Sequence, residues 1–181
     1  MNFQELISRR QSVRRYEDKA VEPEKLQQLI EAVHIAPSAC NSQPWKLILV
    51  DDSELKNKVA KATFSKTVSF NKFAVQAPLI AVLVIEKAKL IAQIGGSIKN
   101  IEYPNIDVGI AAEHFCLQAT ELGLGTCMIG WFDEKRIQKL LNIPGKRKIG
   151  LLITVGYPPE DYKLRKKIRK PVDEICGFNS Y

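Results

Sequence analysis

The sequence predicts an α+β sandwich around a central sheet, in one domain that spans residues 1–181. Two patterns support this class: apolar residues recur at helical spacing in some segments, and short continuous apolar runs occur in others. The two kinds of segment are interleaved unevenly, without the steady strand–helix alternation of a doubly wound parallel fold. No repeat, linker or change in composition divides the chain. A length of 181 residues suits a single domain that buries about 70% of its unfolded surface.

Three helices and two strands are predicted in the first half of the chain. Asn2 and Glu5 have the spacing of a capping box, and Pro23 suits the first turn of a helix. The apolar run at 79–85 is continuous, which predicts a strand that is buried on both faces. We therefore expect helices at residues 3–7, at 23–36 and from 53, and strands at 47–50 and 79–85.

The second half is predicted to hold two helices and two strands, with Asp133 capping the second helix and Gly123 ending the first. We expect a surface loop at residues 87–104, helices at 105–122 and from 133, and strands at 126–129 and 149–155. The basic tail to Tyr181 contains too little apolar side chain to form its own core. It must lie along another surface, either that of its own domain or that of a partner subunit.

The composition limits the class of protein. A hydrophobic content of 45% and a charged content of 26% are typical of a soluble globular protein. The longest apolar run, residues 78–85, is too short to cross a membrane, and the first residues lack the pattern of a secretory signal. We expect a cytoplasmic location. The net charge of +7 attracts anions, which could be nucleic acid, a membrane surface or a phosphorylated small molecule.

The cysteines and histidines do not form a metal-binding pattern. No C-x-x-C pair occurs, and the residues are scattered: Cys40, Cys116, Cys127, Cys176, His34 and His114. This arrangement disfavours a zinc site or an iron–sulfur cluster. The four cysteines are expected to be buried free thiols. Both histidines lie in apolar helical stretches and are expected to be structural.

Two clusters of cations lie near opposite ends of the chain. Residues 9–15 contain four arginines and a serine, and residues 163–170 contain six cations. Arginine forks match phosphate oxygens, and a serine hydroxyl can add another hydrogen bond. Taken singly, the first cluster could be a solvated turn and the second a tail that is disordered or binds nucleic acid. One phosphate site built from both ends would explain both clusters.

A polar segment framed by prolines, residues 37–45, separates a predicted helix from a predicted strand. Its hydroxyl and amide groups need hydrogen-bond partners, which a bound polar cofactor could supply, although an ordinary connection has similar composition. The chain contains no G-x-S-x-G or P-loop motif, and the glycines at 123 and 125 follow a helix instead of a strand. No pair of carboxylates is placed for acid–base catalysis. An enzyme of this sequence would therefore take its chemistry from a cofactor.

These segments resemble the motifs of the FMN-dependent nitroreductase family, in order along nearly the whole chain. The matching segments are Arg10-Gln11-Ser12-Val13-Arg14, Pro37-Ser38-Ala39-Cys40-Asn41-Ser42-Gln43-Pro44-Trp45, Asp107-Val108-Gly109-Ile110-Ala111 through Gly123-Leu124-Gly125-Thr126-Cys127, and Lys167-Ile168-Arg169-Lys170-Pro171. The resemblance implies a three-layer α/β/α sandwich with a mostly antiparallel sheet. It also implies a homodimer with FMN at the subunit interface and a C-terminal segment packed on the partner subunit.

The resemblance also implies which residues bind the cofactor. Arg10, Ser12, Lys167 and Arg169 would hold the phosphate, and Arg14 would lie at the flavin N1/O2 edge. The remaining candidates are Gln11 in the first motif, Asn71 at the pyrimidine edge, Met128, Ile129, Gly130 and Trp131 near flavin N5, and Pro37, Ser38, Ala39 and Asn41 from the partner. No catalytic side chain and no metal ligand is expected. Ala39 and Cys40 depart from the family, in which small hydroxyl residues are common at these positions.

The implied activity is hydride transfer from NADH or NADPH through flavin N5 to a small electron-poor acceptor, such as a nitroaromatic or a quinone, in a ping-pong reaction. Other reductive chemistry on the same flavin remains open, including enone reduction, dehalogenation and flavin handling. A basic module that binds nucleic acid is a further alternative, but it leaves residues 37–45 unexplained. We expect neither nucleic acid nor a membrane as a partner.

Overall fold

The computed structural model describes residues 1–181 and contains a four-stranded sheet in the order β1–β2–β4–β3. The strands are β1 (Trp45–Val50), β2 (Leu79–Ile85), β3 (Gly125–Ile129) and β4 (Lys148–Gly156). Each neighbouring pair runs antiparallel. The predicted α+β class with an antiparallel central sheet is confirmed.

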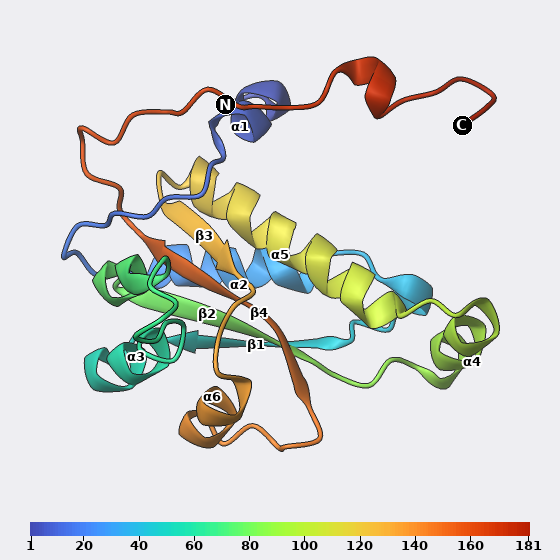
Figure 1. The fold of residues 1–181 in the computed structure, drawn as a ribbon, viewed down its shortest axis with the longest axis horizontal. Coiled ribbons are helices and arrows are strands. Elements are labelled where there is room, and N and C mark those ends of the chain that lie inside the picture. The colour runs from blue at the N-terminus through green and yellow to red at the C-terminus, as the bar shows by residue number, and fades with distance from the viewer.

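Six helices accompany the sheet and lie on both of its faces (Figure 1). The helices are α1 (Phe3–Arg9), α2 (Pro23–His34), α3 (Ser53–Ala60), α4 (Leu90–Lys99), α5 (Tyr103–Glu121) and α6 (Glu134–Leu140). Helices α2 and α5 pack on one face of the sheet, and α3 and α6 on the other. The chain thus forms three layers, as the resemblance implies.

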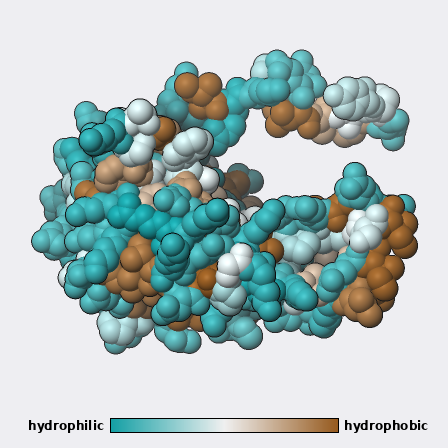
Figure 2. Space-filling model, turned by 60° about the horizontal axis from the view of Figure 1, so that its bottom comes forward, coloured by the Kyte–Doolittle hydropathy of each residue, from teal (hydrophilic) through white to brown (hydrophobic).

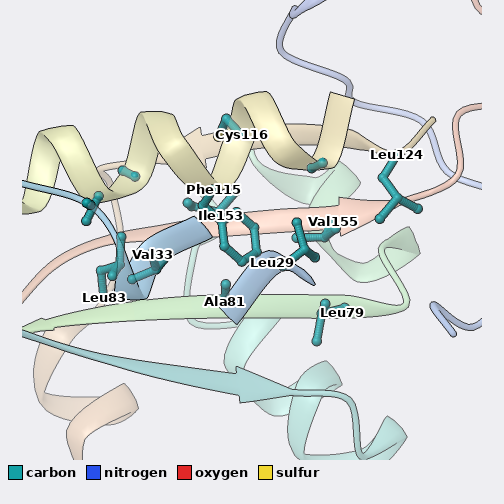
Figure 3. Close-up of a cluster of buried hydrophobic side chains, with 14 of the residues drawn as sticks. Leu29, Val33, Leu79, Ala81, Leu83, Phe115, Cys116, Leu124, Ile153 and Val155 are labelled. Atoms are coloured by element: carbon teal, nitrogen blue, oxygen red, sulfur yellow. The ribbon is translucent and has the colours of Figure 1, made fainter. Parts of the chain in front are cut away.

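The central strand β2 contributes to the cores on both faces of the sheet. Because side chains alternate along a strand, Leu79, Ala81 and Leu83 join the core under α2 and α5, while Ile80 and Val82 join the opposite core. Figure 3 shows the first core, in which labelled residues of β2 and β4 lie near those of α2 and α5. This double burial explains why residues 79–85 form an unbroken apolar run.

Several predicted helix ends are confirmed. Asn2 and Glu5 form the capping box of α1, and the Asp133 side chain accepts a hydrogen bond from the Arg136 backbone at the start of α6. Gly123 follows α5 with a φ of +76°, in the left-handed region that glycine adopts without strain. Short-range capping chemistry therefore determines these boundaries.

The predicted surface loop at residues 87–104 is wrong, because this segment contains α4 and the first two residues of α5. A pair of adjacent glycines is typical of a loop, but Gly95 and Gly96 lie inside α4. Gly96 is required by close packing, since a Cβ atom there would lie 2.6 Å from the Ile101 carbonyl oxygen. The helical signal was the spacing of the apolar residues in 90–98, most of which are exposed and form the hydrophobic surface on the right of Figure 2.

The expectation that all four cysteines are buried is half wrong. Cys116 and Cys127 are buried in the fold, whereas Cys40 and Cys176 are exposed. No group of three or more potential metal ligands occurs. No helix is long and apolar enough to cross a membrane.

The last residues, 157–181, form what we call the C-terminal arm. It leaves β4, passes α1 and then extends away from the sheet and helices (Figures 1 and 2). Apart from a short 3-10 turn at Val172–Glu174, its second half has no regular structure, and every residue from Pro171 onward is exposed. As predicted from its composition, the arm has no core of its own.

Candidate functional site

An extended segment between α1 and α2 forms one side of the candidate site. Ser12 pairs with Thr126 of β3 in a parallel bridge, and the Val13 N–H donates to the Thr126 carbonyl at 2.8 Å. Val13 is buried against Gly125, where an added Cβ would lie 2.6 Å from a Val13 methyl carbon. Because side chains alternate along extended backbone, Arg10 and Ser12 face the opposite side.

The C-terminal arm lies alongside this segment and is joined to it by side-chain hydrogen bonds. The Gln11 Oε1 accepts from the Arg165 backbone N–H at 3.1 Å, and its Nε2 donates to the Lys163 carbonyl at 3.4 Å. The Arg165 guanidinium donates to the Ser12 carbonyl, and the Lys167 ammonium donates to the Arg10 carbonyl. Residues from the two ends of the chain are thereby held side by side.

Together the two segments enclose a cavity of about 390 Å³, which we call the cationic cavity. Its lining residues are Arg10, Gln11, Ser12, Arg165, Lys166, Lys167, Ile168 and Arg169. The structure therefore brings together all four residues that are expected to hold the phosphate: Arg10, Ser12, Lys167 and Arg169. Residues of both cationic clusters thus line the same cavity.

The electrostatics of the cationic cavity favour an anion. Five of its eight lining residues are Arg or Lys, and no acid is among them. One of these cations forms an ion pair with an acid outside the lining: Arg10 Nε lies 3.3 Å from Glu113 Oε1. Desolvation by burial lowers the pKa of Lys167, and the neighbouring charges of Arg10 and Arg169 lower it further. Cations held this close together repel one another until an anion binds between them.

Gln11 and Arg14 differ from the other predicted residues of the first motif. The polar atoms of Gln11 are engaged by the C-terminal arm, so this residue builds the wall of the cavity. Arg14 is exposed and is not part of the lining, although its backbone N–H donates to the Tyr162 hydroxyl at 3.0 Å. An ion pair between Arg15 and Asp161, at 2.5 Å, adds a further contact between the same two segments.

A second group of predicted residues meets at the end of β3. Asn71 is buried, and its Nδ2 donates to the Trp131 carbonyl at 3.2 Å and to the Thr63 carbonyl at 3.1 Å. Ile129 is buried, whereas Met128, Gly130 and Trp131 are exposed. The structure thus places Asn71 beside the 128–131 segment, as expected if both approach the same ring.

The third group is the proline-framed loop, residues 37–45, which lies at the start of α5. It contains a short 3-10 turn at Ala39–Asn41. The Ala39 N–H donates to Asp107 Oδ1 at 3.0 Å, and the Gln43 N–H donates to Ser38 Oγ at 2.8 Å. None of the loop's residues, including Pro37 and Asn41, lines the cationic cavity of the same chain.

Sequence reasoning missed two residues that shape these sites. In the sequence, Arg165 is one of six cations in residues 163–170. Nothing in this pattern indicates that its guanidinium donates to the main-chain oxygen of Ser12. Asp107 was noted as part of a motif without a role, yet its side chain is buried and holds the loop. An acid within an otherwise apolar helical stretch is the signal that could have identified it.

Comparison with known proteins agrees with this architecture. The sequence profile described as the nitroreductase family matches residues 7–157. A Streptococcus pyogenes protein that carries the name of an NAD(P)H nitroreductase is 30% identical, covering 97% of this chain and 98% of its own. The iodotyrosine deiodinase of Thermotoga neapolitana is 25% identical, covering 98% and 97%. The solved structure of an FMN-dependent nitroreductase from Clostridium difficile R20291 is 29% identical, with a TM-score of 0.74 and coverage of 97% and 98%.

The three-layer fold and the profile match over most of the chain define the class. The chain belongs to the nitroreductase family.

Proposed function

We propose that residues 1–181 form one FMN-binding domain of an oxidoreductase that transfers hydride from NADH or NADPH to a small electron-poor acceptor, such as a nitroaromatic or a quinone. The observation that carries this proposal is the cationic cavity, in which Arg10 and Ser12 meet Lys167 and Arg169. The names of the relatives from Streptococcus pyogenes and Clostridium difficile support the reductant and the cofactor.

The residues of the cationic cavity suit the phosphate monoester of FMN. Guanidinium, ammonium and hydroxyl groups all donate hydrogen bonds to phosphate oxygens, and each charge-assisted bond contributes about 1.5–3 kcal/mol. Two or three such bonds contribute about 3–9 kcal/mol, which reaches micromolar binding at the upper end of this range. Burial, followed by the charges of Arg10 and Arg169, lowers the pKa of Lys167, and a bound anion would offset the part that comes from these neighbouring charges.

The two other groups of residues are proposed to hold the flavin ring. Arg14 would lie at its N1/O2 edge, where a positive charge favours the anionic reduced form. Asn71 would lie at the pyrimidine edge, and backbone groups of the 128–131 segment would lie near N5. Bound FMN would supply the chemistry by accepting hydride from the nicotinamide and passing it to the acceptor. The chain itself would position the ring.

We propose that the working unit is a homodimer in which the loop of one subunit covers the ring held by the other. The exposed apolar side chains of the arm support this, because Ile168, Phe178 and Tyr181 contact almost nothing in a single chain. An apolar groove of about 390 Å³ between α1, α2 and α5, with Phe3 and Ile35 at its surface, is available for a second copy. Sedimentation of the purified protein would measure the mass directly.

The test of the cofactor compares the protein with two double variants. Purified protein should bind FMN and appear yellow. It should lose this visible absorbance when NADH or NADPH is added without oxygen. Lys167→Ala with Arg169→Ala should weaken FMN binding at least tenfold, since two charge-assisted bonds are lost. Lys146→Ala with Lys148→Ala removes the same charge from a different surface and should leave the affinity unchanged. Wild-type protein that does not bind added FMN would refute the proposal.

The acceptor is to be identified with a panel of compounds, each tested with both NADH and NADPH. The panel should contain a nitroaromatic, a quinone, an enone, free flavin and an iodotyrosine, because a deiodinase is among the relatives. A cytoplasmic location is proposed because NADH and NADPH are available there, and cell fractionation would test it.

A further inference from the structure

Asp107 has an unusual environment within α5. The residue is buried, with 3% of its surface exposed, and Oδ1 accepts a hydrogen bond from the Ala39 N–H at 3.0 Å. Its other oxygen, Oδ2, is the one buried side-chain polar atom in the protein without a hydrogen-bond partner. Burying a carboxylate is costly unless its oxygens are bonded, so an acid at this position calls for a functional explanation.

The loop that Asp107 contacts has a strained backbone. Cys40, Asn41 and Gln43 adopt φ values of 52°, 50° and 47°, in the left-handed region that non-glycine residues rarely enter. Such conformations persist only when the surroundings hold them, and they are concentrated at ligand-binding and active sites. Something outside the loop must therefore hold it in this shape.

Few side-chain hydrogen bonds connect residues 37–43 to the rest of the fold. Three side-chain bonds lie within the loop: the Gln43 N–H donates to Ser38 Oγ, and Gln43 Nε2 donates to the Asn41 carbonyl and to Asn41 Oδ1. Two others leave it: the bond from Ala39 to Asp107, and one from the Lys89 N–H to Ser42 Oγ at 3.3 Å. The bond to Asp107 is the shorter of these two and has a carboxylate acceptor, so it is the stronger tie.

We propose that Asp107 is a positioning residue that holds residues 37–43 in the shape needed to cover the cofactor of the partner subunit. This inference rests on the proposed function. Asp107 does not line the cationic cavity and acts through the Ala39 backbone. Because the loop serves the other subunit, loss of Asp107 from one chain should impair the site whose phosphate is held by its partner.

The first experiment measures FMN affinity by quenching of flavin fluorescence, together with thermal unfolding of the FMN-free protein. Asp107→Ala should weaken FMN binding about tenfold to a hundredfold, through loss of one charge-assisted bond and release of the loop. Asp107→Asn keeps a carbonyl acceptor for the Ala39 N–H and should remain within about threefold of wild type. If both variants weakened FMN binding equally, the proposal that the hydrogen bond from Ala39 to Asp107 holds the loop would be wrong.

Asp52→Ala is the matched control. Asp52 also accepts a backbone hydrogen bond, from the Leu55 N–H at 2.8 Å, but it caps α3 away from the loop. This variant should lose thermal stability and keep its FMN affinity. An Asp107→Ala variant that unfolds earlier but binds FMN as wild type does would show that the residue is merely structural. Failure of wild-type protein to bind FMN would instead refute the proposed function.

The second experiment tests action across subunits. Asp107→Ala has a defective loop, and Lys167→Ala with Arg169→Ala has a defective cavity. When the two chains are co-expressed with different tags and the mixed dimer is purified, one site combines an intact cavity with an intact loop. The mixed dimer should regain about half of the wild-type activity, because one of its two sites is intact. A mixed dimer no more active than its parents would overturn the proposal.

Discussion

The ammonium of Lys167 donates a hydrogen bond to the main-chain oxygen of Arg10, at 2.5 Å, across 157 positions of sequence. This contact joins the C-terminal arm to the segment that follows α1 and brings the two cationic clusters into one cavity. It also leaves Lys167 crowded by Arg10 and Arg169, an arrangement that an anion would stabilise.

The lowered pKa of Lys167 predicts how anion binding depends on pH. A lysine whose pKa lies below 10.5 loses its proton, and with it its charge, at a lower pH than an ordinary lysine. FMN affinity should therefore fall as the pH rises through this lowered value. Lys167→Arg should retain its affinity to higher pH, because a guanidinium does not titrate there. Fluorescence titrations over an alkaline pH series would measure both, and identical profiles would contradict the prediction.

Replacement of Gln11 should release the arm without removing a charge. Gln11→Ala loses the hydrogen bonds to the backbone of Arg165 and Lys163. We expect FMN binding to weaken by about three- to tenfold, because net losses of about 0.5–1.5 kcal/mol are typical of neutral hydrogen bonds. Proteolysis within residues 163–170 should become faster. Gln27→Ala, at an exposed position of α2 outside the groove between α1, α2 and α5, is the control and should change neither quantity.

Gly125→Ala should displace the segment that holds Arg10 and Ser12. The new Cβ would lie 2.6 Å from a methyl carbon of Val13, so we expect a loss of about 1–3 kcal/mol in the free energy of unfolding. Gly109→Ala meets no atom within 4 Å and should stabilise helix α5 by up to about 1 kcal/mol. Urea denaturation compares the two variants. A partial rescue of Gly125→Ala by Val13→Ala would identify the clash as the cause.

The two buried cysteines should be protected from thiol reagents in the folded protein. Burial raises the pKa of the Cys116 thiol to about 12, so almost no thiolate exists at neutral pH. Cys127 is shielded by burial in β3. Mass spectrometry after brief alkylation should find both unmodified in native protein and modified after denaturation. Rapid labelling of Cys116 in the native state would show that the packing under α5 is looser than the structure indicates.

The helix ends and the buried strand could be predicted from the sequence, because they depend on residues that are close together in the chain. The capping box at Asn2, the helix stop at Gly123 and the buried run at 79–85 follow from local backbone chemistry and side-chain alternation. Helix α4 was missed because its two glycines lower helix propensity, and because the tight approach of Gly96 to Ile101 arises only in the folded chain.

The sequence by itself determined the α+β class and the two clusters of cations, because periodicity and charge are properties of short segments. Only the tertiary structure decided that Gln11 binds the arm, that Asn71 lies beside Trp131, and that Asp107 holds the loop at Ala39. These contacts join residues far apart in the chain. Their geometry depends on how the helices pack against the sheet, which no local pattern encodes.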